Sequence, residues 1–326
     1  MIDLDTIAKT ARKAIQIGFD RSVANTLARM TRAEVLRLLE LNDVYTLIQE
    51  FAITADDLAP LQDAVEESYH AAASAYTAKG IPARYRLIPF NRRHLRAEQA
   101  IKEEGGRLIA DITADSRAAI QQAVMRGLRQ GSSPARLATD LAGVYDRAAQ
   151  VRRGGIIGLS RVQEGWAAAA ADELAMGNPR YLRRVLRDRR YDPLVKKALA
   201  EGRPLRTDEI MRLTQRYRDK LVRSRAETIA RTETHTVLNM GRFEKIAQTA
   251  ERAGVGLDKI TVKWQAARDG RVRDTHGHLR GKTAQYGQPF SSGGHRLRYP
   301  GDRSLGAPAS EIVNCRCNLT FEVDLS

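Results

Sequence analysis

Apolar residues recur at helical intervals along the first part of the chain. Over residues 4–51 they are spaced by three and four positions, which predicts amphipathic helices. Thr54 and Asp57 then have the spacing of a capping box, and the apolar stripe that follows them stops at Gly80, with Pro82 just beyond. A further helix is therefore predicted between these two signals.

The helical pattern continues through the middle of the chain. Residues 115–130 place an apolar stripe on one face, Gly131 ends that run, and Ser133 followed by Pro134 starts the next one. The glycine pair at 154–155 predicts a joint between two modules. The N-terminal half is therefore predicted to be helical.

The pattern changes after about residue 225. One long helix is predicted to about residue 250, followed by short runs that alternate apolar and polar residues, as half-buried strands do. The apolar members of these runs are Ile260, Val262 and Trp264, then Leu319, Phe321 and Val323. We expect the two runs to pair. The predicted fold class is α+β: a mainly helical N-terminal module (1–155), a basic helical connector (156–225) and a C-terminal helix-plus-small-sheet domain (226–326).

The length of the chain indicates more than one module, and its net charge indicates a polyanionic partner. A chain of 326 residues exceeds what one core usually organises, and 54 Lys and Arg against 39 Asp and Glu give a net charge of +15. Between residues 180 and 225 there are 16 basic and 6 acidic residues, which indicates binding to nucleic acid or to an acidic protein rather than a merely solvated helix face. The candidate nucleic-acid contacts are Arg183, Arg184, Arg187, Arg189, Arg190, Lys196 and Lys197.

Several classes of protein are excluded or disfavoured. No apolar stretch approaches the roughly 20 residues that cross a bilayer, and the N-terminus has acidic residues where a signal peptide would be basic, so we expect a cytosolic protein with no membrane partner. The two cysteines are expected to stay reduced. Neither GxxxxGK[ST] nor GxGxxG occurs, which argues against an NTP-driven motor.

One carboxylate interrupts an otherwise apolar helical face. Glu233 falls on the stripe that contains Ile229 and Met240, and a buried carboxylate without a partner costs several kcal/mol. We expect a guanidinium of Arg271 or Arg273 to pair with it, as a structural ion pair rather than a catalytic base. Asn239 lies at the edge of the same face, where its amide could hold a neighbouring loop.

Histidine and cysteine are concentrated in the last hundred residues. They are His235, His276, His278, His295, Cys315 and Cys317. The CxC pair could supply two zinc ligands, with His276 and either His278 or His295 completing a tetrahedron. A nucleophilic cysteine would instead need His276 or His295 beside it and Asn314 or Asp269 to orient the imidazole. Because no standard zinc or nucleophile motif surrounds the cysteines, we favour plain buried thiols and expect no cofactor, with structural zinc as the alternative.

An ordered set of short motifs in this region resembles one family. The set is RTE at 231–233, Asn239, the strand ending at Trp264, DGRVRDTH at 269–276, Leu279, Gly281, YPGD at 299–302 and NCRC at 314–317. It resembles the C-terminal domain of the Mu F-like minor head morphogenesis proteins of tailed bacteriophages, over residues 225–323. The matching positions are Arg231, Glu233, Asn239, Asp269, Arg273, His276, Gly281, Pro300, Asn314, Cys315 and Cys317. The resemblance transfers no catalytic role to them, and His278 and His295 are not clear family positions.

The resemblance implies a role in the phage head. It implies a low-copy minor capsid component of the virion, added in the host cytoplasm during head assembly near the portal, inside the shell, and associated with DNA packaging or delivery. The implied partners are the portal protein, the major capsid protein and phage double-stranded DNA. Residues 1–155 would then dock on the shell or portal, because amphipathic helices bury one face in a partner groove. The alternative function is a cysteine- or zinc-dependent hydrolase acting on peptide or cell-wall material.

Overall fold

The computed structural model describes residues 4–324 except 78–80, 87, 149 and 268–269. The chain forms two compact units, each assembled from segments that are distant in sequence. The first contains Met1–Gly18, Leu61–Leu108 and Glu227–Ser326, and the second contains Phe19–Pro60 and Ile109–Ala226. Helices α1 (Leu4–Arg29), α6 (Leu95–Arg129) and α10 (Thr207–Arg252) contribute long stretches to both units, and α4 (Ala59–Ala75) contributes only its first two residues to the second. The functional division into docking module, connector and C-terminal domain stays a prediction.

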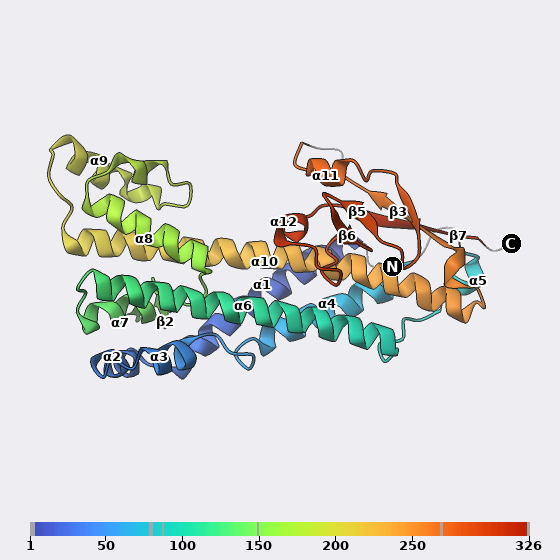
Figure 1. The fold of residues 1–326 in the computed structure, drawn as a ribbon, viewed down its shortest axis with the longest axis horizontal. Coiled ribbons are helices and arrows are strands. Elements are labelled where there is room, and N and C mark those ends of the chain that lie inside the picture. Colours follow the sequence, from blue (N-terminus) through green and yellow to red (C-terminus); the bar gives the residue numbers. More distant parts are fainter. Residues whose placement is uncertain (1–3, 78–80, 87, 149, 268–269, 325–326) are drawn as a thin grey trace. The chain divides into compact units, whose positions relative to one another are not determined.

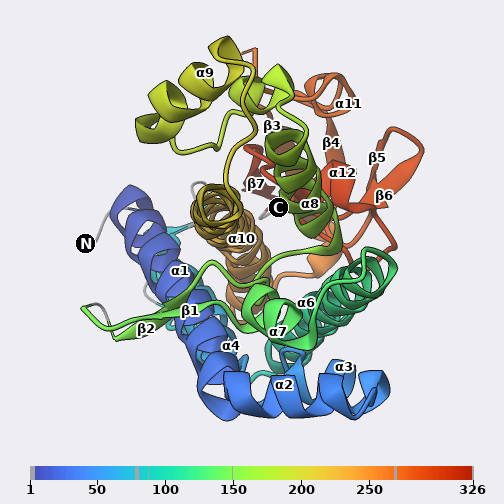
Figure 2. The same cartoon turned by 90° about the vertical axis from the view of Figure 1, so that its left-hand side faces the viewer.

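The second unit is built mainly from short capped helices. Its further elements are α2 (Arg32–Glu40), α3 (Val44–Phe51), α7 (Pro134–Ala142), β1 (Val144–Asp146), β2 (Val151–Arg153), α8 (Arg161–Ala175), η1 (Pro179–Arg183), η2 (Arg189–Tyr191) and α9 (Asp192–Ala200). Helix α2 packs against α7 (Figure 2). Ser133 caps α7 by accepting a hydrogen bond from the Arg136 N–H, as its position before a proline predicts. The β1–β2 hairpin departs from the all-helical pattern predicted for the N-terminal half.

The first unit joins helices to a small sheet. Its further elements are α4 (Ala59–Ala75), α5 (Ala83–Arg86), η3 (Leu257–Lys259), β3 (Ile260–Gln265), α11 (Asp274–Gly277), β4 (Thr283–Gln285), β5 (Phe290–Ser292), β6 (His295–Leu297), α12 (Ala309–Ile312) and β7 (Asn318–Val323). The predicted α+β class is confirmed (Figure 1).

The predicted pairing of the two alternating runs is also confirmed. The three-stranded sheet has the order β4-β3-β7 and is antiparallel, with Val262 opposite Phe321 and Trp264 opposite Leu319. One face of the sheet contacts α10, where the ring of Phe243 lies 6.4 Å from that of Phe321. The apolar side chains of both strands are buried except that of Val323, which is half-buried, so this face and α10 form the core that supports the functional residues.

Some helix boundaries differ from the prediction. Thr54 and Asp57 form the reciprocal backbone bonds of a capping box, at 3.0 and 3.3 Å, but helix α4 begins only at Ala59. Helix α6 begins 20 residues before the predicted start at 115, and α10 begins at Thr207 rather than after residue 225. None of the described helices combines the length and the apolar character needed to cross a bilayer.

Candidate functional site

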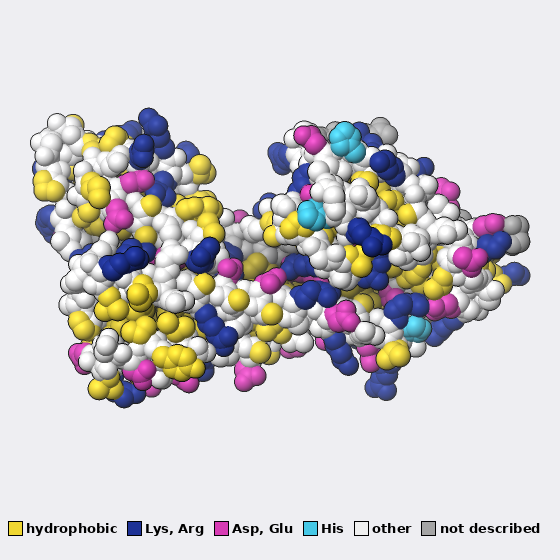
Figure 3. Space-filling model, in the orientation of Figure 1, with side chains coloured by type: hydrophobic (Ala, Val, Ile, Leu, Met, Phe, Trp, Pro, Cys, Tyr) yellow, Lys and Arg dark blue, Asp and Glu magenta, His cyan; other side chains and the backbone are white. Residues whose placement is uncertain are grey.

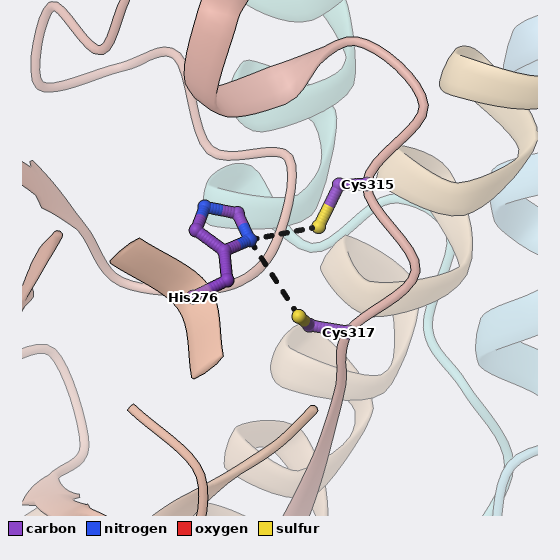
Figure 4. A group of neighbouring side chains, drawn as sticks. All are labelled: His276, Cys315 and Cys317. Carbon is purple, nitrogen blue, oxygen red and sulfur yellow. Dashed lines mark hydrogen bonds between the residues drawn. The ribbon is translucent and has the colours of Figure 1, made fainter. Parts of the chain in front are cut away.

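One histidine and two cysteines converge in the first unit. The Nδ1 atom of His276 lies 3.4 Å from Cys315 Sγ and 3.5 Å from Cys317 Sγ (Figure 4). His276 is on α11, and the cysteines lie between α12 and β7. The exposed fractions of the three residues are 1%, 4% and 1%. Residues about 40 positions apart in sequence therefore meet at one buried point.

The other ring nitrogen of His276 contacts a carboxylate. Its Nε2 lies 3.0 Å from Glu311 Oε2, and Ser292 Oγ donates to the same oxygen at 2.7 Å. Burial alone would raise the pKa of Glu311, but the hydrogen bonds from Ser292 and His276 lower the pKa overall. An ionised Glu311 accepts the Nε2 proton, which leaves the Nδ1 lone pair directed at the two sulfurs.

The two thiols are not equivalent. A hydrogen bond from Cys315 lowers the pKa of Cys317 to about 5, against the opposing effect of burial, and the contact with His276 acts in the same direction. The interaction with Cys317 and then burial raise the pKa of Cys315. Cys317 is therefore the more acidic thiol of the pair. Both cysteines are free thiols in the structure.

Helix α10 fixes the backbone of the CxC segment. The carbonyl oxygen of Cys317 accepts hydrogen bonds from His235 Nε2 and from Asn239 Nδ2, the latter at 3.2 Å. Asn314 adopts a left-handed backbone conformation, with φ of 58°, and its N–H donates to Thr232 Oγ1 at 3.1 Å. The amide predicted to hold a loop, Asn239, thus holds the segment that carries the sulfurs.

Aromatic rings form one wall of the site. Trp264 is fully buried, and its ring meets that of His276 nearly edge-on, with centroids 5.4 Å apart. Phe290 packs edge-on against the same indole at 5.2 Å. The imidazole is therefore held between an apolar wall and the carboxylate of Glu311.

The predicted ion pair of Glu233 forms with a different arginine. Arg303 Nη2 contacts Glu233 Oε1, and Arg303 Nε lies 3.4 Å from Glu104 Oε1. Arg273, one of the two predicted partners, instead donates to the carbonyl oxygen of Val313. Glu233 is therefore part of a buried structural cluster, as expected, but its described partner lies in the loop after the YPGD motif.

The other matching positions have backbone or surface roles. Gly281 has φ of 77° in the turn before β4. Gly301 has φ of 95°, and a Cβ there would lie 2.5 Å from Thr236 Oγ1, so this glycine lets the loop that contains buried Pro300 approach α10. Arg231 is exposed, and Asp269 lies outside the described residues.

The alternative zinc shell with His278 or His295 as a fourth ligand is not assembled among the described residues. His278 and His295 are both exposed, and the group of possible metal ligands among the described residues contains only His276, Cys315 and Cys317. An open catalytic cysteine is disfavoured too: the Cys–His–carboxylate order is present, but all its members are buried. The possible ligand atoms of this closed site are two sulfurs and one imidazole nitrogen.

Most of the basic candidates are paired within the chain. The pairs are Arg184 with Glu173 at 2.7 Å, Arg187 with Asp192 at 2.8 Å, Arg190 with Asp188 at 2.6 Å and Lys197 with Glu201 at 3.8 Å. Arg183, Arg189 and Lys196 are exposed and form no ion pair within the described residues. On the face drawn in Figure 3, Lys and Arg are interspersed with Asp and Glu. Five of the seven predicted contacts are thus exposed, and three of these five have no ion pair among the described residues.

Sequence reasoning missed three residues that complete these clusters: Glu311 and Ser292, which hold the far side of His276, and Arg303, which pairs with Glu233. It named His235 among the clustered histidines but gave it no role, whereas the structure places its Nε2 on the carbonyl oxygen of Cys317. Only Arg303, which follows YPGD directly, had a motif beside it to indicate its position.

Comparison with known proteins supports one family. Residues 193–320 match the family model described as Phage Mu protein F like protein. This confirms the resemblance of the C-terminal region and extends it toward the N-terminus, to residue 193. Searches of curated proteins and of solved structures found no significant match to the chain.

Proposed function

We propose that this chain, whose residues 193–320 match the Phage Mu protein F like model, is a minor head morphogenesis protein of a tailed bacteriophage. In this proposal it joins the head at low copy during assembly in the host cytoplasm. It lies inside the shell next to the portal and acts in DNA packaging or delivery. The family match is the observation that carries the proposal.

The local geometry supports a structural role for the matching positions. Glu233, Asn239 and Asn314 make internal contacts, and Gly301 permits a close approach between a loop and α10. These are the contacts of a scaffold that must hold one shape. A protein built into a shell needs such a scaffold to present its partner surfaces.

Virion composition tests this function. DNA-filled heads of the phage that encodes the chain would be purified, and their protein copy numbers measured by mass spectrometry. We expect the chain at a small, fixed ratio to the portal protein and far below the major capsid protein. Expression in the infected cell without incorporation into heads would contradict a structural role and favour a transient assembly factor. Crosslinking within purified heads would identify whether its neighbours include the portal.

One observation favours the alternative function. Cys317, His276 and Glu311 follow one another in the order of a nucleophile, a base and an orienting carboxylate. A cysteine- or zinc-dependent hydrolase of peptide or cell-wall material would use this order. Hydrolysis of peptidoglycan or a peptide library by the wild-type chain, lost in Cys317→Ala and kept in Arg231→Ala, would establish it. Burial of all three residues is why we rank it second.

A further inference from the structure

The spacing of the three buried ligands is that of atoms bonded to one ion. Zinc binds imidazole nitrogen at about 2.0–2.1 Å and thiolate at about 2.3 Å, which places tetrahedral N and S ligands roughly 3.6 Å apart. The two Nδ1 to Sγ distances here are 3.4 and 3.5 Å. Both sulfurs therefore lie where a shared metal ion would hold them.

Hydrogen bonding alone accounts poorly for this convergence. A neutral imidazole that donates its Nε2 proton to Glu311 has a single lone pair at Nδ1, and that pair can accept one S–H. Yet two sulfurs approach the same nitrogen almost equally. A cation at the centre would give each of the three atoms a bond.

The surroundings of His276 are also those of a metal ligand. Metal-binding histidines almost always donate their second ring N–H to a carboxylate, carbonyl or water, which fixes the tautomer and the ring orientation. Glu311 has this position, and it is itself held by Ser292 at 2.7 Å and by Thr275 at 3.4 Å. On the other side, α10 holds the Cys317 carbonyl. Both the ligands and their supports are in place.

We propose that His276 Nδ1, Cys315 Sγ and Cys317 Sγ bind one zinc ion that links α11 to the segment preceding β7. Thiolate and imidazole ligands select zinc over magnesium and calcium. Both sulfurs bind as thiolates, so any thiol proton leaves for solvent on binding. The fourth tetrahedral position goes to a water molecule, because no other His, Cys, Asp or Glu among the described residues belongs to the group. The proposal is independent of the role in the head.

Metal analysis of the full chain tests this site. The protein would be expressed in zinc-supplemented medium, purified without chelator and measured by inductively coupled plasma mass spectrometry. We expect about one zinc per chain in wild type. We expect loss of zinc in Cys317→Ser and in His276→Gln, and full retention in the controls His278→Gln and His295→Gln, which change exposed histidines outside the group.

Two further measurements test the site even if the ligand variants fail to fold. In wild type, Co²⁺ should give a thiolate-to-cobalt charge-transfer band that added Zn²⁺ abolishes. Glu311→Gln keeps all three ligands, so it should remain folded by circular dichroism and bind zinc about 10–100-fold more weakly. Three results would overturn the proposal. They are less than about 0.1 zinc per folded wild-type chain together with no cobalt band, stoichiometric copper or iron in place of zinc, and unchanged zinc content in Cys317→Ser.

Discussion

The side-chain amide of Asn239, in the middle of α10, donates to the carbonyl oxygen of Cys317 at 3.2 Å. The long helix thereby fixes the backbone directly after the second cysteine. Truncation in Asn239→Ala removes this donor and leaves His235 as the carbonyl's remaining described partner. We expect the free energy of unfolding to fall by about 1–3 kcal/mol, the cost of a lost buried hydrogen bond.

Tryptophan fluorescence can measure this loss of stability in the first unit alone. Trp264 is fully buried beside the site, whereas Trp166 is 49% exposed and lies in the second unit, so urea unfolding would be followed in a Trp166→Phe background. Arg231→Ala, on the exposed side of the same helix, is the control and should change stability by less than about 0.5 kcal/mol. Equal midpoints for Asn239→Ala and the control would show that this bond does not stabilise the unit.

Glu233 and Arg303 should be energetically coupled. Glu233 is buried and Arg303 half-buried, and Arg303 also lies 3.4 Å from Glu104, so removing one partner leaves a charge only partly compensated. In a double-mutant cycle with Glu233→Gln and Arg303→Gln we expect a coupling energy of about 1–3 kcal/mol. The exposed pair of Lys259 and Asp324, 3.7 Å apart, is the control and should show much weaker coupling. If the effects of the two substitutions on the free energy of unfolding were additive, Glu233 and Arg303 would not be energetically coupled in solution.

Gly301→Ala should destabilise the first unit more than Gly306→Ala does. Both glycines have positive φ, 95° and 81°, so alanine is strained at either position by about 1–2 kcal/mol. Only at Gly301 would the new Cβ also meet α10, 2.5 Å from Thr236 Oγ1. The difference between the two urea midpoints therefore isolates the close approach of the loop to the helix. Indistinguishable midpoints would mean that the loop can move away from α10.

Asp57 should contribute stability that acid removes. Burial would raise the pKa of this carboxyl, but the hydrogen bonds from Arg29 and from the Thr54 N–H outweigh that effect and lower the pKa. A carboxyl whose pKa is lower in the folded than in the unfolded protein stabilises the fold fully when the pH is above the unfolded-state pKa. This stabilisation is lost as the pH falls through the folded-state pKa. Wild type should therefore lose more stability than Asp57→Asn between pH 7 and about pH 3. Circular dichroism during urea unfolding measures this, with exposed Asp56→Asn as the matched control.

The sequence carried enough information for the sheet but not for the clusters. Alternation of apolar residues around Trp264 and Phe321 determines which side chains can face a helix, and the observed pairing follows from that constraint. The partner of Glu233 could not be derived in this way, because Arg271, Arg273 and Arg303 all lie in irregular segments without a period. Likewise, Glu311 reaches His276 only through the fold of the α12 segment, and no local pattern encodes that contact.

Burial also decided questions that residue type alone left open. Four histidines near a CxC pair permit several ligand sets by composition, but among the described residues the ring that lies against Trp264 and beside both sulfurs is that of His276. Burial and pairing also affect the charge. Basic residues outnumber acidic ones between residues 180 and 225, but carboxylates of the same chain, such as those of Glu173 and Asp192, neutralise part of this excess. Sequence counts therefore overestimate the number of cations available to a partner.

If DNA is a partner, the exposed cations should carry the contact. Phosphate neutralisation releases counterions, and affinity then falls with salt by a slope of about 0.9 per phosphate contact. The triple variant Arg183→Ala, Arg189→Ala and Lys196→Ala should therefore reduce the slope of log K against log salt by up to about 3 in filter binding with duplex DNA. The control variant removes three exposed lysines of the first unit: Lys9, Lys13 and Lys282.

Comparing the two variants separates local contact from net charge, because each removes the same number of positive charges. An equal loss of affinity in both would indicate that net charge alone attracts DNA to the chain. If wild type itself fails to bind duplex DNA at low salt, the basic segment has an acidic protein surface as its partner instead. In that case the exposed Arg183, Arg189 and Lys196 would be the residues to test against the portal and the major capsid protein.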